Sequence, residues 1–438
     1  MSARGLSVSP RDNGSVNRPS ASRPATNADA GPERDAEVFP PELELLFCLE
    51  RPEPLLAAAA QVDWSAAVAL ARDHRLEGRL HRALERCGAG DTSSPATASL
   101  RSAYEQQAVF AEFYLFPQLE AVCAALLDAG VTPTLLKGAA LVAGGIVPAG
   151  VRPMADIDVL VPRARFANAQ AALDRAGYRA RVDARTRQRS VTRSYGDAPL
   201  HHREHPMSLD LHWHLQGPHH RHPFDPEALQ TCELRLPGGA RVQRLTDPDL
   251  LAHLCLHFWR DRAKGLPGPL GQLWDVHDLS VRLTDEGWER LVGDSPHRGH
   301  RGVVAATVAL THLLFAAPLP PRFPQAGRLA DDPRLHAFTL RRVLAPRPPH
   351  LQMLVVTPDT TSRPYRMATR AISHLRHGDP WPGPEAQPDP EAPLGAVATR
   401  RARARHAFHL LRLVGILARH PGRSRAELAI DRWAHDLT

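Results

Sequence analysis

The sequence has few aromatic residues, few cysteines and no long apolar run, and each scarcity excludes a class of protein. Aromatic residues make up 5% of the 438 residues, without the signature of an RNA-binding module. The five cysteines (Cys48, Cys87, Cys123, Cys232 and Cys255) form no C-x-x-C pair. This pattern predicts buried thiols in the reducing cytoplasm rather than a disulfide scaffold. No apolar run reaches about 18 residues, so no transmembrane segment is expected, and the N-terminus lacks the apolar core of a signal peptide.

The formal net charge is +7, which permits anionic partners such as nucleotides without requiring them. The length suffices for a sizeable core and predicts two domains plus tails. Composition divides the chain into a disordered tail at 1–37, an N-terminal helical region at 38–130, an α/β core at 131–246, a C-terminal helical domain at 247–375, a Pro-rich linker at 376–394 and a basic amphipathic helical tail at 395–438.

Apolar periodicity predicts the elements within these segments. Helices are expected around 41–50 and 64–87, with a long helix around 97–129. In the core we expect a short strand at 132–136, then a helix beginning near 139, and a crossover helix at 163–177 that ends at Gly177. The residues around Gly238-Gly239 predict a hairpin, and helices return from Asp247 onward.

The most informative stretch is D-I-D-V-L-V at 156–161, because it places two carboxylates in a strand pattern. With a period of two, Asp156 and Asp158 project from the same face, about 7 Å apart along the strand. Two buried like charges are costly unless a cation lies between them. The pair therefore predicts a divalent metal ion that carries phosphates.

Basic residues upstream are suited to hold those phosphates. A short strand runs into Lys137-Gly138 and then into a helix start, which makes a backbone cradle for phosphate, and Lys137 adds a charge. Arg152, just before the acid-bearing strand, offers a planar fork for phosphate oxygens. We therefore assign Lys137, Gly138 and Arg152 to nucleotide binding.

A second alternating strand at 207–215, M-S-L-D-L-H-W-H-L, supplies a third acid. Asp210, His212 and His214 share one face of this strand. If the strand pairs beside 156–161, Asp210 completes a site of three carboxylates suited to Mg²⁺ or Mn²⁺. His212 is then a candidate to line the nucleotide pocket.

Together these motifs resemble the uncharacterised nucleotidyltransferase family of the polymerase-β-like superfamily. The resemblance rests on Lys137-Gly138, R-P-M-x-D-I-D-V-L-V at 152–161, a helix ending in A-G-Y-R-A, and L-D-L-H-W at 209–213, and it covers residues 40 to 295. It implies an α+β fold in which helical regions flank a small mixed-sheet nucleotidyltransferase core.

The resemblance also implies an activity and roles for the acids. The enzyme would use Mg²⁺ or Mn²⁺ to move a nucleoside monophosphate from a nucleoside triphosphate, such as ATP, to an acceptor, and would release pyrophosphate. Asp156 and Asp158 would bind metal, and Asp210 would bind metal or take the acceptor's proton. The acceptor could be a small molecule, a peptide or RNA. One departure stands out: Ala139 brings no hydroxyl to the phosphate turn.

Two other readings remain open. Ala139 favours a catalytically silent, nucleotidyltransferase-like binding module in a biosynthetic assembly. The eight histidines between His201 and His222 invite a zinc hydrolase, although their spacing is irregular. The helical histidines His253 and His257 are expected to line the cleft.

Asp275 and the basic C-terminal helix each have a functional and a purely structural interpretation. Asp275 matches an acid in the family's helical region, or makes a local ion pair. The basic C-terminal helix could contact an anionic surface weakly.

Overall fold

The computed structural model describes residues 39–89, 94–194, 196–215, 227–264, 269–293 and 298–333, together with residues 335 and 339. From Pro40 onward these residues belong to one compact unit. The predicted tail at 1–37, the Pro-rich linker at 376–394 and the basic helical tail at 395–438 lie outside the described residues.

The N-terminal region is helical, as predicted, but a helix at 52–59 lies where none was predicted and one predicted helix is divided. Prolines at the first helical position and the Asp63 side chain, which accepts from two backbone N–H groups, begin several of its helices. The helix predicted at 64–87 is divided in two around Arg75. The helices are α1 (Pro41–Phe47), α2 (Pro52–Ala59), α3 (Trp64–Asp73), α4 (Glu77–Arg86), α5 (Pro95–Phe110) and α6 (Phe116–Asp128).

Helices α5 and α6 are continuous through a π-helical turn at Ala111–Leu115. The resulting helix, Pro95–Asp128, is long and apolar enough to cross a membrane by length and composition alone, which the search for apolar runs did not predict. However, Leu115, Leu119 and Val122 are buried, as in the core helix of a folded domain. The described residues therefore contain no clear transmembrane segment.

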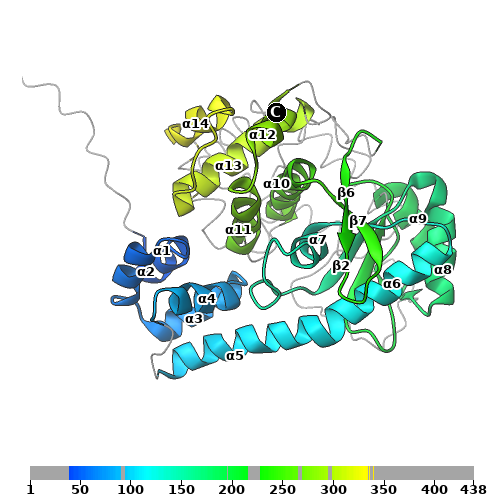
Figure 1. The fold of residues 1–438 in the computed structure, drawn as a ribbon, viewed down its shortest axis with the longest axis horizontal. Coiled ribbons are helices and arrows are strands. Elements are labelled where there is room, and N and C mark those ends of the chain that lie inside the picture. The colour runs from blue at the N-terminus through cyan, green and yellow to red at the C-terminus, as the bar shows by residue number, and fades with distance from the viewer. Residues whose placement is uncertain are drawn as a thin grey trace, which may run out of the picture. The chain divides into compact units, whose positions relative to one another are not determined.

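The described residues form a mixed sheet of seven strands in the order β3-β4-β5-β2-β1-β7-β6. Helices α6 and α8 lie on one side of it and α7 and α10 on the other (Figure 1). This arrangement confirms the predicted α+β fold. The strands are β1 (Thr134–Leu135), β2 (Asp156–Leu160), β3 (Arg179–Ala180), β4 (Leu200–His201), β5 (Ser208–His212), β6 (Thr231–Arg235) and β7 (Arg241–Leu245).

The core helices and turns also follow the sequence closely. The expected helix after β1 is α7 (Lys137–Ala143), which begins two residues earlier than predicted, and the crossover helix is α8 (Phe166–Arg175). Gly177 ends α8 with φ +94°, and Gly239 closes the β6–β7 hairpin with φ +96°. Both glycines adopt a backbone conformation that other residues rarely reach.

Strand β5, which carries Asp210, is fixed at its start by a side chain of α6. The fully buried Gln118 amide donates to the Met207 carbonyl at 2.8 Å and accepts from the Met207 N–H at 3.2 Å. Two otherwise unpaired backbone groups are thereby satisfied next to the strand. This pairing sets where β5 begins relative to the helical layer.

The same strand ends earlier than the alternation predicted. β5 stops at His212 instead of continuing to Leu215. Trp213 turns aside, and its indole N–H donates to the Val191 carbonyl at 3.3 Å. The Arg163 guanidinium lies over the same ring, 4.7 Å from its centroid. These contacts replace the ladder, so the alternating pattern past His212 was misleading.

The C-terminal helices share a core with the N-terminal ones. The Trp274 ring stacks on Phe315 at 4.0 Å, its N–H donates to the Leu46 carbonyl at 3.3 Å, and the Arg79 guanidinium lies 5.0 Å from its centroid. These helices are α10 (Asp247–Lys264), α11 (Pro269–Ser280), α12 (Asp285–Val292), α13 (Arg301–Phe315) and α14 (Pro324–Ala330). The remaining helix, α9 (Ala184–Ser194), precedes β4.

All five cysteines are free thiols, as predicted. Cys48, Cys123 and Cys255 are buried, whereas Cys87 and Cys232 are only half-buried.

Candidate active site

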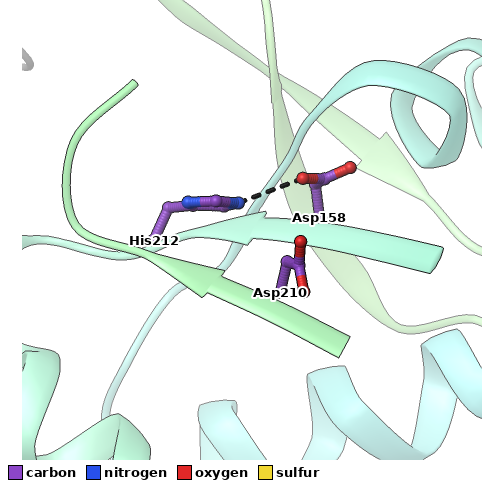
Figure 2. A group of neighbouring side chains, drawn as sticks. All are labelled: Asp158, Asp210 and His212. Carbon is purple, nitrogen blue, oxygen red and sulfur yellow. Dashed lines mark hydrogen bonds and ion pairs between the residues drawn. The ribbon is translucent and has the colours of Figure 1, made fainter. Parts of the chain in front are cut away.

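Two aspartates lie side by side where β2 and β5 pair. The strands are parallel neighbours, and their register places Asp158 directly beside Asp210. His212 follows two residues later on the same face of β5, so the three side chains converge (Figure 2). One ligand atom from each lies within 4.8 Å of the others. The predicted pairing of the two acid-bearing strands is confirmed.

Asp158 is the most buried of the site acids, with 3% of its surface exposed. Its Oδ1 lies 2.5 Å from the Lys137 ammonium and 3.0 Å from Nε2 of His212. Burial alone would raise the pKa of this carboxyl, but the Lys137 charge and the His212 hydrogen bond hold it well below its usual range. Asp158 therefore stays ionised inside the fold.

Asp210 and Asp156 have the opposite electrostatic character. Burial, followed by repulsion from the neighbouring Asp158, raises the pKa of Asp210. Asp156 is exposed at the start of β2, yet its carboxyl loses hydration to the surrounding protein. This desolvation, followed by repulsion from Asp158, raises its pKa too. The site thus concentrates more negative charge than its own cations neutralise.

Asp158, Asp210 and His212 suit a divalent metal ion. Two carboxylates offer hard oxygen ligands of the kind that Mg²⁺ and Mn²⁺ prefer, and an imidazole beside them is compatible with Mn²⁺. The predicted trio named Asp156 where this group has His212. A role for Asp156 in metal binding stays a prediction.

Lys137 reaches Asp158 from a strained backbone position. It is the first residue of α7 and adopts φ +45°, in the left-handed region. A residue other than glycine costs about 1–2 kcal/mol in this conformation. Its side chain is buried between the turn and β2, so the turn brings the lysine charge to the acids.

Gly138 and Arg152, both predicted to bind nucleotide, lie in contact. A Cβ on Gly138 would lie 2.1 Å from Nη1 of Arg152, so any larger residue there would require the guanidinium to move. Nε of Arg152 donates to both oxygens of the buried Asp275 on α11, at 3.0 and 2.9 Å. Asp275 thus anchors an arginine far away in the sequence rather than making the local ion pair that we considered. Ala139, the residue without a hydroxyl, is buried.

The histidine pair of α10 lies on the α7 side of the sheet. The ring centroids of His253 and His257 are 6.3 Å apart, and α10 packs against α7. Desolvation, and then the Lys137 charge, lower the pKa of both imidazoles well below the usual value. Nδ1 of His257 accepts from Arg260 at 2.8 Å and its Nε2 lies 3.2 Å from Asp261. Both histidines are therefore neutral and close to the site.

The other histidines of the 201–222 segment do not form a metal site among the described residues. His202 and His205 pack their rings against Tyr178, and His212 is the member that joins the acids. His219, His220 and His222 lie outside the described residues. The zinc reading thus has no support in the part of the chain that the structure describes.

A family model described as an uncharacterised nucleotidyltransferase matches residues 60–316, which is more than half of the chain. The match includes every site residue discussed above. Searches of curated proteins and of solved structures gave no match.

Proposed function

The chain belongs to the uncharacterised nucleotidyltransferase family, and on this premise we propose that it moves a nucleoside monophosphate from a nucleoside triphosphate to an acceptor. The observation that carries the proposal is the register of β2 and β5, which sets the carboxylates of Asp158 and Asp210 side by side. Carboxylates gathered in this way suit a divalent cation that accompanies a triphosphate.

The proposed metal is Mg²⁺ or Mn²⁺, held by Asp158 and Asp210 with Asp156 or His212 beside them. Such an ion, when bound, neutralises the triphosphate and stabilises the charge on the attacking and leaving oxygens. Lys137 and Arg152 are the cations proposed to hold phosphate oxygens beside the Gly138 turn. Lys137 is paired with Asp158, and Arg152 with Asp275. A bound phosphate would therefore either share each cation with its aspartate or take the place of that aspartate.

The chemistry proposed for the acceptor is a single displacement. The acceptor hydroxyl oxygen forms a bond to the α-phosphorus, and the bond from that phosphorus to the bridging oxygen breaks. Pyrophosphate leaves with the bridging oxygen, and the hydroxyl proton passes to the Asp210 carboxylate and then to solvent. A raised carboxyl pKa favours Asp210 in this role over Asp158, whose pKa is lowered.

One observation supports a different function. The phosphate turn carries the buried Ala139 in place of a hydroxyl, which fits a silent module that binds nucleotide without transferring it. The two functions differ in their products, because the module would release no pyrophosphate.

The experiment is incubation of the protein with mixed nucleoside triphosphates, Mg²⁺ and pools of small molecules, peptides and RNA. Pyrophosphate release is measured together with the mass of each pool. The enzyme reading predicts pyrophosphate and a nucleotide-sized mass gain, both lost in Asp210→Asn. The exposed Glu233, which pairs with Arg241 on the β6–β7 hairpin, provides the matched control Glu233→Gln. Triphosphate binding without either product would favour the silent module.

A further inference from the structure

The junction between α3 and α4 is built around a residue type that such junctions rarely contain. The Arg75 N–H donates to the Arg72 carbonyl at 3.0 Å, and the Leu76 N–H donates to the Ala71 carbonyl at 2.7 Å. These two bonds make the Schellman motif that ends many helices, and Arg75 occupies its left-handed position with φ +58°. The sequence A-R-D-H-R-L-E-G gives no hint of this break.

Four other helices in the described residues end with the same pair of hydrogen bonds, and each has glycine at the left-handed position. Glycine adopts this conformation without a steric penalty, whereas arginine costs about 1–2 kcal/mol there. Arg75 thus differs from these four positions, and among the described helix ends only Ala316, which closes α13 with a single hydrogen bond and φ +55°, is also left-handed without being glycine. The four glycines are Gly88, Gly130, Gly145 and Gly177.

Close packing holds this junction beside the candidate site. A Cβ on Gly78 would lie 2.0 Å from the Gly150 carbonyl oxygen, so α4 presses on the loop that carries Arg152. A Cβ on Gly271 would lie 2.8 Å from the His74 carbonyl oxygen, so α11 packs closely against the junction itself. Because α11 also holds Arg152 through Asp275, the junction, the Arg152 loop and α11 are fixed against one another.

Arg75 also has its charge available. Its side chain is exposed, and it has no hydrogen bond or ion pair to any residue that the structure describes. Lys137 and Arg152, in contrast, are engaged with Asp158 and Asp275. The Arg75 Cβ lies against α11, 3.8 Å from where a Cβ on Gly271 would stand, one helical turn before Asp275, which holds Arg152.

We propose that Arg75 is a phosphate-binding residue of the active site, presented by the N-terminal helical region to the triphosphate. A guanidinium recognises phosphate oxygens through a planar fork of N–H donors. A backbone position that is tolerated at a cost is typical of functional residues. The inference rests on the proposed function, since the triphosphate is the ligand that brings the phosphates.

The test compares two variants of the full chain, Arg75→Gly and Arg75→Lys. Calorimetry with Mg²⁺ measures the affinity for ATP and for tripolyphosphate, which lacks a nucleoside, and a thermal scan measures the unfolding midpoint. Glycine adopts the left-handed conformation without the steric cost, so Arg75→Gly should raise the unfolding midpoint by about 2 °C. The same variant should bind ATP and tripolyphosphate roughly 10- to 100-fold more weakly. Arg75→Lys should bind with intermediate affinity and keep the wild-type midpoint.

The control is Arg82→Ala, which removes an arginine of α4 that is paired with Glu85, and it should bind both ligands like the wild type. Binding by Arg75→Gly within twofold of the wild type would overturn the role of Arg75 and leave the proposed function standing. A loss for ATP alone would also overturn it, because the contact would then be to the nucleoside. If the wild type binds neither ligand, the proposed function itself fails, and this inference with it.

Discussion

At the scale of residues, the two acids of the D-x-D motif are not equivalent. Asp158 is buried and paired with Lys137 and His212, whereas Asp156 is exposed at the start of the strand. Asp158 therefore holds the turn, the strand and the histidine together even without ligand. Asp156 can change without loss of any such contact.

This difference predicts unequal effects of two neighbouring substitutions on stability. Asp158→Asn leaves the Lys137 ammonium buried without its counter-charge, and should lower the free energy of unfolding by about 3 kcal/mol. Asp156→Asn should change it by less than about 0.5 kcal/mol. Urea unfolding at neutral pH measures both values. Equal effects of the two substitutions would mean that the Lys137–Asp158 pair does not stabilise the fold.

Several site residues could be predicted from the sequence because strand alternation is a local property. Asp158, Asp210 and Lys137 each fall at the expected place in a strand or a turn. The acid partners of the basic residues were harder to predict, since Arg152 and Asp275 are 123 positions apart. Arg75 was missed because no turn-forming residue marks its junction, and only the backbone geometry reveals it.

At the scale of elements, α10 carries two neutral histidines that pack into the fold. His253 is buried with 3% exposure, and Nδ1 of His257 accepts a hydrogen bond from Arg260, which a protonated ring nitrogen could not do. Desolvation and the Lys137 charge lower the pKa of both rings. The helix thus packs most favourably when neither imidazole carries a proton.

A pH dependence of stability follows from these lowered pKa values. Above about pH 6.5 both histidines are neutral in the folded and the unfolded chain. Below it, the unfolded chain takes up protons that the folded chain does not, so stability falls as the pH drops. Each histidine should contribute a slope of up to about 1.4 kcal/mol per pH unit between its unfolded and folded pKa.

Urea unfolding from pH 7.5 to 5.5 measures this slope. The double substitution of His253→Gln and His257→Gln should flatten it, whatever the change in stability at pH 7.5. An equally steep slope in the double variant would show that other groups take up the protons.

Element boundaries were predicted well where a glycine or an apolar face defines them, as at Gly177 and in β2. They were missed where tertiary contacts decide. β5 ends at His212 because the Trp213 side chain contacts Val191 and Arg163 and the chain no longer pairs with β2. No pattern in the sequence predicts these contacts.

At the scale of the whole molecule, the fold brings distant segments to one face of a sheet. The α+β class could be predicted, because the family resemblance implies it and the core mixes strand and helix patterns. The sheet order could not, since β1 lies between β2 and β7, and its pairing with β7 joins residues that are more than a hundred positions apart. The N-terminal helix α4 also packs against the loop that carries Arg152, which composition alone did not suggest.

The central claim is that the carboxylates of Asp158 and Asp210 form a metal-dependent triphosphate site. Its most direct test is the unfolding midpoint of the wild type and of Asp210→Asn with each nucleoside triphosphate, with and without Mg²⁺. Asp210→Asn is the sharper variant because it leaves the Lys137–Asp158 pair intact.

We predict that at least one triphosphate stabilises the wild type only when Mg²⁺ is present. The gain should reach about 2.7 kcal/mol at a ligand concentration of a hundred times Kd, and it should disappear in Asp210→Asn. An equal shift in both proteins, a shift that needs no metal, or no shift with any triphosphate would contradict the account.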